Sequence, residues 1–351
     1  MQIALKSPQT ARVDEGPKRR FGSFQIASLG YQAVWESLSR YAILGSLFFL
    51  PYSRRKAIDR WFRGRGEYRK INQADWLLLS WGKSGRTWLR VMLSRFYQLR
   101  FGLEQNRMLG FDNLHRMNND IPTVFFTHGN YLRDYTGHGY DTKVDFHGKR
   151  IVFLARDPRD VAVSQFFQWK FRMRPPKKRL NDYPPHGEDI EIFDFMMNEE
   201  QGLPRVISYF NGWLRGIPDI GDVLVVRYED MRRDPGSVLT SILEFTGTPG
   251  SPEQVADAVE FAAYENLKKM EEKKSFSLWS TGWRLVPGDK KNPDSFKVRR
   301  AKVGGYRDYF DEDQLLKIDA MVDEDLMPEL GYTSAEKDRK HAPAVAGEGA
   351  D

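Results

Sequence analysis

Residues 77–90 read Leu-Leu-Leu-Ser-Trp-Gly-Lys-Ser-Gly-Arg-Thr-Trp-Leu-Arg: a strand-like run, a glycine loop and a helix-like run. The apolar start has the length of a buried strand, and the apolar residues at the end follow helical spacing. Gly82 and Gly85 flank Lys83 and Ser84 between them. This arrangement predicts an anion site, because free backbone N–H groups and the positive end of the helix dipole face the loop.

The loop differs from the Walker sequence that binds nucleoside triphosphates. A Walker loop has four residues between its first glycine and its Gly-Lys-Ser/Thr. Here Leu77 occupies the position of that first glycine. We therefore interpret the loop as a cradle for a smaller anionic group, with hydroxyls from Ser84 and Thr87. The alternative is a tight strand–helix turn that carries a surface lysine.

Strand-like runs alternate with helix-like runs through the middle of the chain. The four runs cover residues 77–80, 123–127, 151–155 and 223–227. Near-continuous apolar strands that are each followed by a helix predict an α/β fold, with a parallel sheet flanked by helices on both faces. Ligands of such sheets bind at the carboxyl ends of the strands. Polar clusters follow all four runs, at Gly82–Thr87, His128, Arg156–Asp160 and Tyr228–Asp230.

The cluster Arg156-Asp-Pro-Arg-Asp-Val-Ala-Val-Ser164 combines a helix start with two anion-binding side chains. Asp157 can cap the helix and Pro158 suits its first position. Arg156 lies at the strand end, where a guanidinium can bind phosphate through two hydrogen bonds. Ser164 follows two helical turns later. The alternative for this segment is a well-capped helix with a surface ion pair.

Composition excludes several kinds of chemistry. The 351 residues contain no cysteine, so disulfides, cysteine nucleophiles and thiolate metal sites are absent. The six histidines show no metal-ligand spacing. The net charge of +6 favours anionic partners. We expect no metal and no nucleic-acid partner, since no nucleic-acid motif is found.

The two ends differ in character from the middle. Residues 1–20 have no apolar core of a signal peptide, whereas residues 31–50 are rich in aromatic and aliphatic side chains and precede a run of arginines. Such a segment either lies in a membrane interface or packs on the domain as a basic helix. We expect an N-terminal extension over residues 1–70, a catalytic domain over 71–333 and a disordered tail over 334–351.

Four segments together resemble the sulfotransferases that use 3′-phosphoadenosine 5′-phosphosulfate (PAPS). They are Lys83–Trp88, Arg156–Ser164, Tyr228–Met231 and Arg299–Phe310, and they occur in the family's order. The chain is similar to a distant, bacterial-type branch of that family. The resemblance implies the P-loop-like sulfotransferase fold and PAPS as co-substrate, without a metal.

The resemblance also implies a role for each matching residue. The 5′-phosphosulfate loop corresponds to Lys83, Ser84, Gly85, Arg86 and Thr87, and the 3′-phosphate site to Arg156, Ser164, Arg299 and Arg300. The residues expected beside the adenine are Trp88, Tyr228 and Tyr264. The chain departs from the family in having Gly82 for a proline, Arg86 for a threonine and Phe126 for a lysine. These departures weaken the assignment of an acceptor more than that of PAPS.

Sulfonate transfer requires a base for the acceptor hydroxyl and a cation at the leaving phosphate. We expect Lys83 to stabilise the leaving oxygen. His128 follows a strand-like run as the family's histidine does, and it is the expected base. A histidine that only bonds to the backbone is the alternative, with a carboxylate such as Asp112 or Asp134 then acting as base.

We therefore expect a sulfotransferase that moves sulfonate from PAPS to a hydroxyl acceptor by in-line displacement. A glycan, a glycolipid and a lipid headgroup remain open as acceptors, and the basic segment 170–179 is a second feature that suits an anionic acceptor. The expected location is the cytoplasm, with peripheral contact at the inner face of the membrane through residues 31–70. Two alternatives are a P-loop kinase-like transferase and a membrane-associated nucleotide-binding protein without turnover.

Overall fold

A parallel β-sheet forms the centre of the computed structural model, which describes residues 38–105, 107–139, 142–273 and 285–334. Within these residues the strands are β1 (Trp76–Ser80), β2 (Val124–Thr127), β3 (Ile151–Ala155) and β4 (Val223–Arg227), in the order β2-β1-β3-β4. Leu77 lies opposite Phe125 on one side and Ile151 on the other. The predicted parallel α/β sheet is confirmed, and each strand begins within one residue of its expected start.

Helices connect the strands and cover the sheet. In chain order they are α2 (Tyr52–Gln73), α3 (Arg86–Arg100), α4 (Leu132–Thr136), η1 (Val144–Phe146), α5 (Pro158–Phe171), α6 (Pro175–Leu180), α7 (Ile192–Met197), α8 (Leu203–Ile220), α9 (Tyr228–Arg233), α10 (Pro235–Phe245), α11 (Pro252–Phe261), α12 (Tyr264–Lys273), η4 (Pro293–Ser295), η5 (Gly305–Tyr309), α13 (Glu312–Asp325) and η6 (Pro328–Leu330). Residues 38–46 are also helical.

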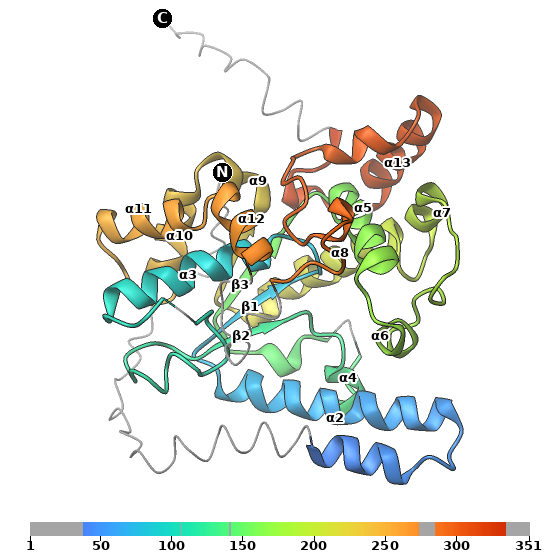
Figure 1. Cartoon of the computed structure of the whole chain (residues 1–351), viewed down its shortest axis with the longest axis horizontal. Coiled ribbons are helices and arrows are strands. Elements are labelled where there is room, and N and C mark those ends of the chain that lie inside the picture. Colours follow the sequence, from blue (N-terminus) through green and yellow to red (C-terminus); the bar gives the residue numbers. More distant parts are fainter. Residues whose placement is uncertain (1–37, 106, 140–141, 274–284, 335–351) are drawn as a thin grey trace, which may run out of the picture.

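The strands are apolar throughout because alternate side chains enter two different cores. Leu78 and Val152 pack with α3, α10 and α11 on one face of the sheet. Leu77 and Phe153 pack with α5, α8 and α13 on the other face. Figure 1 shows these two groups of helices on opposite sides of the strands. This burial on both faces explains why the runs lack polar alternation.

The strand order places the site. The chain moves from β1 outward to β2 and then returns past β1 to β3, so the order reverses between β1 and β3. In open parallel sheets, ligands bind in the crevice at this point, beyond the carboxyl ends of the strands. The glycine loop follows β1 and Arg156 follows β3. The fold therefore brings together two clusters that are separated by about seventy residues in the sequence.

The N-terminal helix α2 packs against α4 through a close backbone contact. A Cβ atom on Gly64 would lie 2.3 Å from the Tyr131 carbonyl oxygen, so only glycine allows this approach. None of the described helices is long and apolar enough to cross a bilayer. Residues 31–37 of the apolar segment and residues 335–351 of the expected tail lie outside the described residues.

Candidate functional site

The loop between β1 and α3 has the backbone shape of an anion cradle. Lys83 and Gly85 have φ angles of 74° and 94°. A Cβ on Gly85 would lie 2.5 Å from a ring carbon of Tyr228, so the loop needs glycine at this position. The Ser84 hydroxyl is buried and has no hydrogen-bond partner among the described residues. A buried, unsatisfied donor at a helix N-terminus fits a group that binds an anion.

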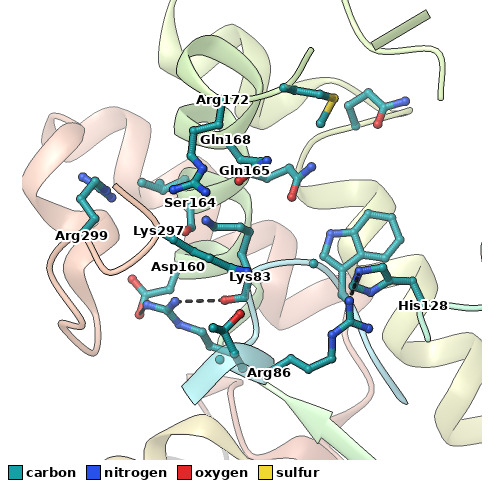
Figure 2. A pocket seen from close by; sticks show the side chains of 18 of the residues that line it. Lys83, Arg86, His128, Asp160, Ser164, Gln165, Gln168, Arg172, Lys297 and Arg299 are labelled. Carbon is teal, nitrogen blue, oxygen red and sulfur yellow. Dashed lines mark hydrogen bonds and ion pairs between the residues drawn. The ribbon is translucent and has the colours of Figure 1, made fainter. Parts of the chain in front are cut away.

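Lys83 lies among other cations. Burial lowers the pKa of Lys83 to about 7, and Arg172, Arg156 and Arg299 lower it further by repulsion. Figure 2 shows Lys83, Arg172 and Arg299 reaching into the same space from three different segments. A multivalent anion in this space would relieve the repulsion and favour the charged form of the lysine.

Arg156 joins the two strand-end loops. Its Nη1 donates a hydrogen bond to the Lys83 carbonyl oxygen at 3.2 Å. Its guanidinium lies 4.4 Å from the centre of the Tyr228 ring and 3.4 Å from the Asp160 carboxylate. Its Nε is buried without a partner in the described parts of the chain. Arg156 thus retains a free donor on a guanidinium that is already held in place, which suits phosphate recognition.

A buried glutamate anchors the late basic segment to the pocket. Glu271 is fully buried and accepts backbone hydrogen bonds from Lys297 at 2.7 Å and from Val298 at 2.9 Å. The same carboxylate forms an ion pair with Arg172 at 3.2 Å. In the sequence, Arg172 belongs to the basic segment 170–179, which is expected to suit an anionic acceptor. The structure instead makes it a clamp between α5 and the residues that precede Arg299.

Arg299 and Arg300 have different environments. The Tyr264 hydroxyl donates to the Arg299 carbonyl oxygen at 2.9 Å, and the Arg299 guanidinium lies 4.0 Å from the Phe167 ring centre. Arg300 is more exposed and pairs with Asp308 at 3.1 Å. Both arginines line the pocket. Arg299 is held in place, whereas Arg300 can exchange its partner for an anion.

His128 is fixed by two hydrogen bonds. Its Nδ1 lies 2.5 Å from the Ser80 carbonyl oxygen. A carbonyl only accepts, so Nδ1 carries the proton and Nε2 presents its lone pair. Arg86 Nη2 lies 2.8 Å from that Nε2, and Arg86 Nη1 donates to the Thr127 carbonyl oxygen at 3.0 Å. Figure 2 shows this pair on the opposite side of Lys83 from Arg299.

One large cavity collects almost all of the residues predicted from the sequence. The cavity measures about 1420 Å³. Its walls include Lys83, Gly85, Arg86, Thr87, Trp88, His128, Arg156, Ser164, Tyr228, Tyr264, Arg299 and Arg300. Ser84 is the exception, because it is buried beneath the loop. Trp88 and Tyr228 meet edge to face with ring centres 5.9 Å apart.

The sequence analysis missed the contribution of α2. Arg60, Arg63 and Glu67 line the cavity from this helix. Glu67 accepts a hydrogen bond from the Tyr131 backbone N–H at 3.1 Å, and burial raises its pKa to about 7. The sequence offered only a weak signal, a glycine within a helical pattern at Gly64, because Gly66 in the same helix meets no neighbouring atoms.

Two carboxylates considered as alternative bases lie elsewhere. Asp112 pairs with Arg116 at 2.8 Å, and Asp134 pairs with Arg60 at 3.0 Å. Neither aspartate lines the cavity. Glu67 does line the cavity, and its raised pKa suits a proton acceptor near neutral pH.

The basic segment 170–179 divides between several environments. Lys170 pairs with Asp189, and Lys178 is buried with its ammonium 4.7 Å from the Trp169 ring centre. Arg174 and Lys177 line the cavity. The second half of the segment belongs to the short helix α6 (Pro175–Leu180), which forms part of the cavity wall.

Comparisons with known proteins identify relatives of this chain. A family model described as "Sulfotransferase domain" matches residues 140–330, more than half of the chain. Cytosolic sulfotransferase 17 of Arabidopsis thaliana is 24% identical over 286 residues, which cover 73% of this chain and 75% of that protein. Flavonol 4′-sulfotransferase of Flaveria chlorifolia is 24% identical over 277 residues, covering 73% and 80%.

The fold is similar to that of solved sulfotransferases. A mouse sulfotransferase crystallised with PAP (adenosine 3′,5′-bisphosphate) superposes on this chain with a TM-score of 0.50 at 18% identity. The match covers 77% of this chain and 90% of that one. The family match begins after the glycine loop, and the structural similarity extends over most of the chain. From the family match and the shared fold, the chain belongs to the sulfotransferase family.

Proposed function

We propose that this protein transfers the sulfonate group of PAPS to a hydroxyl acceptor. The observation that carries the proposal is the large cavity in which Lys83, Arg156 and Arg299 surround one space. Ser84 Oγ and Arg156 Nε add donors that lack partners among the described residues. A doubly phosphorylated nucleotide would satisfy these groups, and the mouse relative was crystallised with PAP.

The residues divide into three binding regions. We assign the 5′-phosphosulfate to Lys83, Ser84, Gly85, Arg86 and Thr87. We assign the binding of the 3′-phosphate to Arg156, Ser164, Arg299 and Arg300. We assign the binding of the adenine to Trp88, Tyr228 and Tyr264. In Figure 2, Arg299 and His128 lie on opposite sides of Lys83.

His128 and Lys83 supply the chemistry of the transfer. The acceptor oxygen forms a bond to sulfur while the bond from sulfur to the phosphate oxygen breaks. His128 Nε2 takes the proton of the acceptor hydroxyl, because the Ser80 carbonyl holds the proton of the other ring nitrogen. Lys83 neutralises the charge that develops on the leaving phosphate. The Arg86 guanidinium must move away from His128 Nε2 so that the acceptor hydroxyl can approach this nitrogen.

The acceptor end of the cavity favours a polar, charged molecule. Outside the residues assigned to the nucleotide, the cavity walls include the polar side chains of Arg60, Arg63, Glu67, Asn130, Tyr131, Arg133, Arg174, Lys177, Asn181, Glu200 and Arg205, together with apolar ones such as Trp81, Phe126 and Met173. Flat apolar acceptors require apolar walls, since unpaired polar groups are costly to bury. We therefore propose a glycan, a glycolipid or a lipid headgroup as acceptor. The proposed location is the cytoplasm, with contact at the inner face of the membrane, and the proposed catalytic domain comprises residues 71–333.

The test is transfer of sulfur-35 from labelled PAPS to a panel of glycans, glycolipids and lipids. Lys83→Ala should abolish transfer, whereas Lys317→Ala on the exposed face of α13 should leave it unchanged. Tighter binding of magnesium–ATP than of PAP would instead support a kinase-like transferase. Binding of PAP without transfer to any acceptor would support a nucleotide-binding protein without turnover.

A further inference from the structure

The N-terminal helices expose a group of large apolar side chains. Phe48 and Phe49 are 77% and 68% exposed, and they meet edge to face with ring centres 6.0 Å apart. Leu38, Tyr41 and Tyr52 are also exposed on the same segment. Figure 1 shows residues 38–46 on the side of α2 that faces away from the sheet. A soluble monomer rarely leaves so many neighbouring aromatics in water.

This apolar group lies in the most basic part of the structure. Residues 38–73 contain nine arginines and lysines and two carboxylates, an excess of seven positive charges that exceeds the net +6 of the whole chain. Both carboxylates are engaged within the protein. Asp59 pairs with Arg40 and Arg63 at 2.9 and 3.0 Å, and Glu67 accepts from Tyr131. The charged side chains of this segment that are exposed, Arg54 and Arg65, are therefore both positive.

Helix α2 presents one face to the cavity and the opposite face to the surroundings. Arg54, Trp61, Arg65 and Tyr68 recur at near multiples of the helical repeat, so they form one stripe. Arg54 and Arg65 are exposed, whereas Trp61 and Tyr68 are 39% and 38% exposed and also contact the Tyr135 ring of α4, with ring centres 5.3 and 5.5 Å apart. The opposite stripe is formed by Arg60, Arg63 and Glu67, which line the acceptor end of the cavity. One helix thus separates the exposed basic and aromatic surface from the place where the acceptor binds.

We propose that residues 38–73 form a docking surface for an anionic bilayer. The Phe48 and Phe49 side chains enter the interface, Trp61 and Tyr68 lie at headgroup level, and Arg54 and Arg65 bind lipid phosphates. Trp and Tyr favour this level because they are both apolar and polar, and each basic side chain near an anionic surface adds about 1 kcal/mol. The excess of positive charge in residues 38–73 complements an anionic lipid surface, so we take the bilayer as the partner.

Docking of this surface would place the acceptor end of the cavity beside the lipid headgroups. This second step rests on the proposed function, because it takes the acceptor hydroxyl to belong to a lipid headgroup that binds in the cavity beside α2. Arg60 and Arg63 would contact the anionic part of that headgroup. The docking itself requires no sulfonate transfer, so the two parts can fail separately.

Sedimentation of the full chain with vesicles tests the docking. Vesicles of phosphatidylcholine with about 30% phosphatidylserine should pellet the protein, and vesicles of phosphatidylcholine alone should pellet much less. Raising the salt to about 1 M should weaken binding, because the arginine–phosphate attraction is screened. Phe48→Glu combined with Phe49→Glu should lower the fraction bound by about tenfold or more.

Two controls match these changes in type and charge. Leu316 on α13 is 70% exposed, and Lys317 beside it is also exposed. Leu316→Glu should leave vesicle binding unchanged, and Lys317→Glu should do the same where Arg65→Glu reduces it. PAP affinity, measured on every variant, reports that the catalytic fold is intact. Failure of the wild-type chain to bind anionic vesicles, or equal losses in the α13 controls, would overturn the docking proposal while leaving the proposed function untouched.

Discussion

PAP binding should take up a proton through Lys83. In the ligand-free protein, burial and neighbouring arginines lower the pKa of Lys83 to about 7. A phosphate dianion beside the ammonium returns the pKa toward its usual value near 10.4. Binding therefore requires protonation of a lysine that is largely neutral above pH 7.

The size of the effect follows from these two values. At pH 8.5 a lysine with a pKa of 7 is only about 3% protonated, whereas one with a pKa near 10.4 is almost fully charged. Binding at this pH should take up close to one proton, and the apparent Kd should rise by up to about tenfold per pH unit above 7. The affinity for PAP is therefore greatest below the pKa of Lys83 in the free protein, and it falls as the pH rises through and above that pKa.

Calorimetry in buffers of widely different ionisation enthalpy measures the uptake directly. The work belongs above pH 8, where the phosphates of PAP no longer titrate. Lys83→Arg is the matched control, because a guanidinium stays charged throughout this range and should remove the uptake while retaining a positive charge. Uptake near zero in the wild type, or undiminished uptake in Lys83→Arg, would refute the reasoning.

Three further changes test other parts of the site. Gly64→Ala should lower the free energy of unfolding in denaturant by about 1–3 kcal/mol, because its Cβ would meet the backbone at the start of α4. Gly66→Ala is the control: its Cβ would lie in open space, so this change should raise the free energy of unfolding by up to about 1 kcal/mol. Equal effects of the two changes would contradict the packing of α2 on α4. Arg86→Thr should weaken PAP binding by about tenfold, because Arg86 is assigned to the 5′-phosphosulfate, and it should leave His128 Nε2 open to neutral hydroxyl acceptors; unchanged PAP affinity would contradict the assignment. Glu271→Gln should weaken PAP binding by about tenfold and lower the Tm, because the late segment loses its charged anchor; unchanged calorimetry would exclude that anchor.

The sheet could be predicted because its strands carry a local signal. Each strand is a short apolar run that ends in a polar cluster, and parallel strands buried on both faces show that pattern without alternation. The pairing of Arg156 with the glycine loop followed from the rule that strand ends share one edge. The local signals and the general rule therefore agreed, and the strand bounds differ by no more than one residue.

Other features depend on contacts that no local pattern encodes. Arg172 belongs to a run of basic residues in the sequence, but its partner Glu271 is supplied by α12, about a hundred residues later. Glu67 resembles any helix surface carboxylate until α4 covers it, and its raised pKa exists only in that environment. Burial and distant partners determine these properties, so the sequence alone could not predict them.

The arginine at position 86 links the chemistry to the acceptor. A threonine there would leave the His128 lone pair open, whereas Arg86 donates to Nε2 while no acceptor is bound. In the proposed transfer, an acceptor would then need more than a hydroxyl, because it has to draw a guanidinium away from a hydrogen bond. An anionic group beside the hydroxyl does so by charge. The substitution of Arg86 and the basic wall from α2 therefore favour the same acceptor: a hydroxylated molecule that carries negative charge.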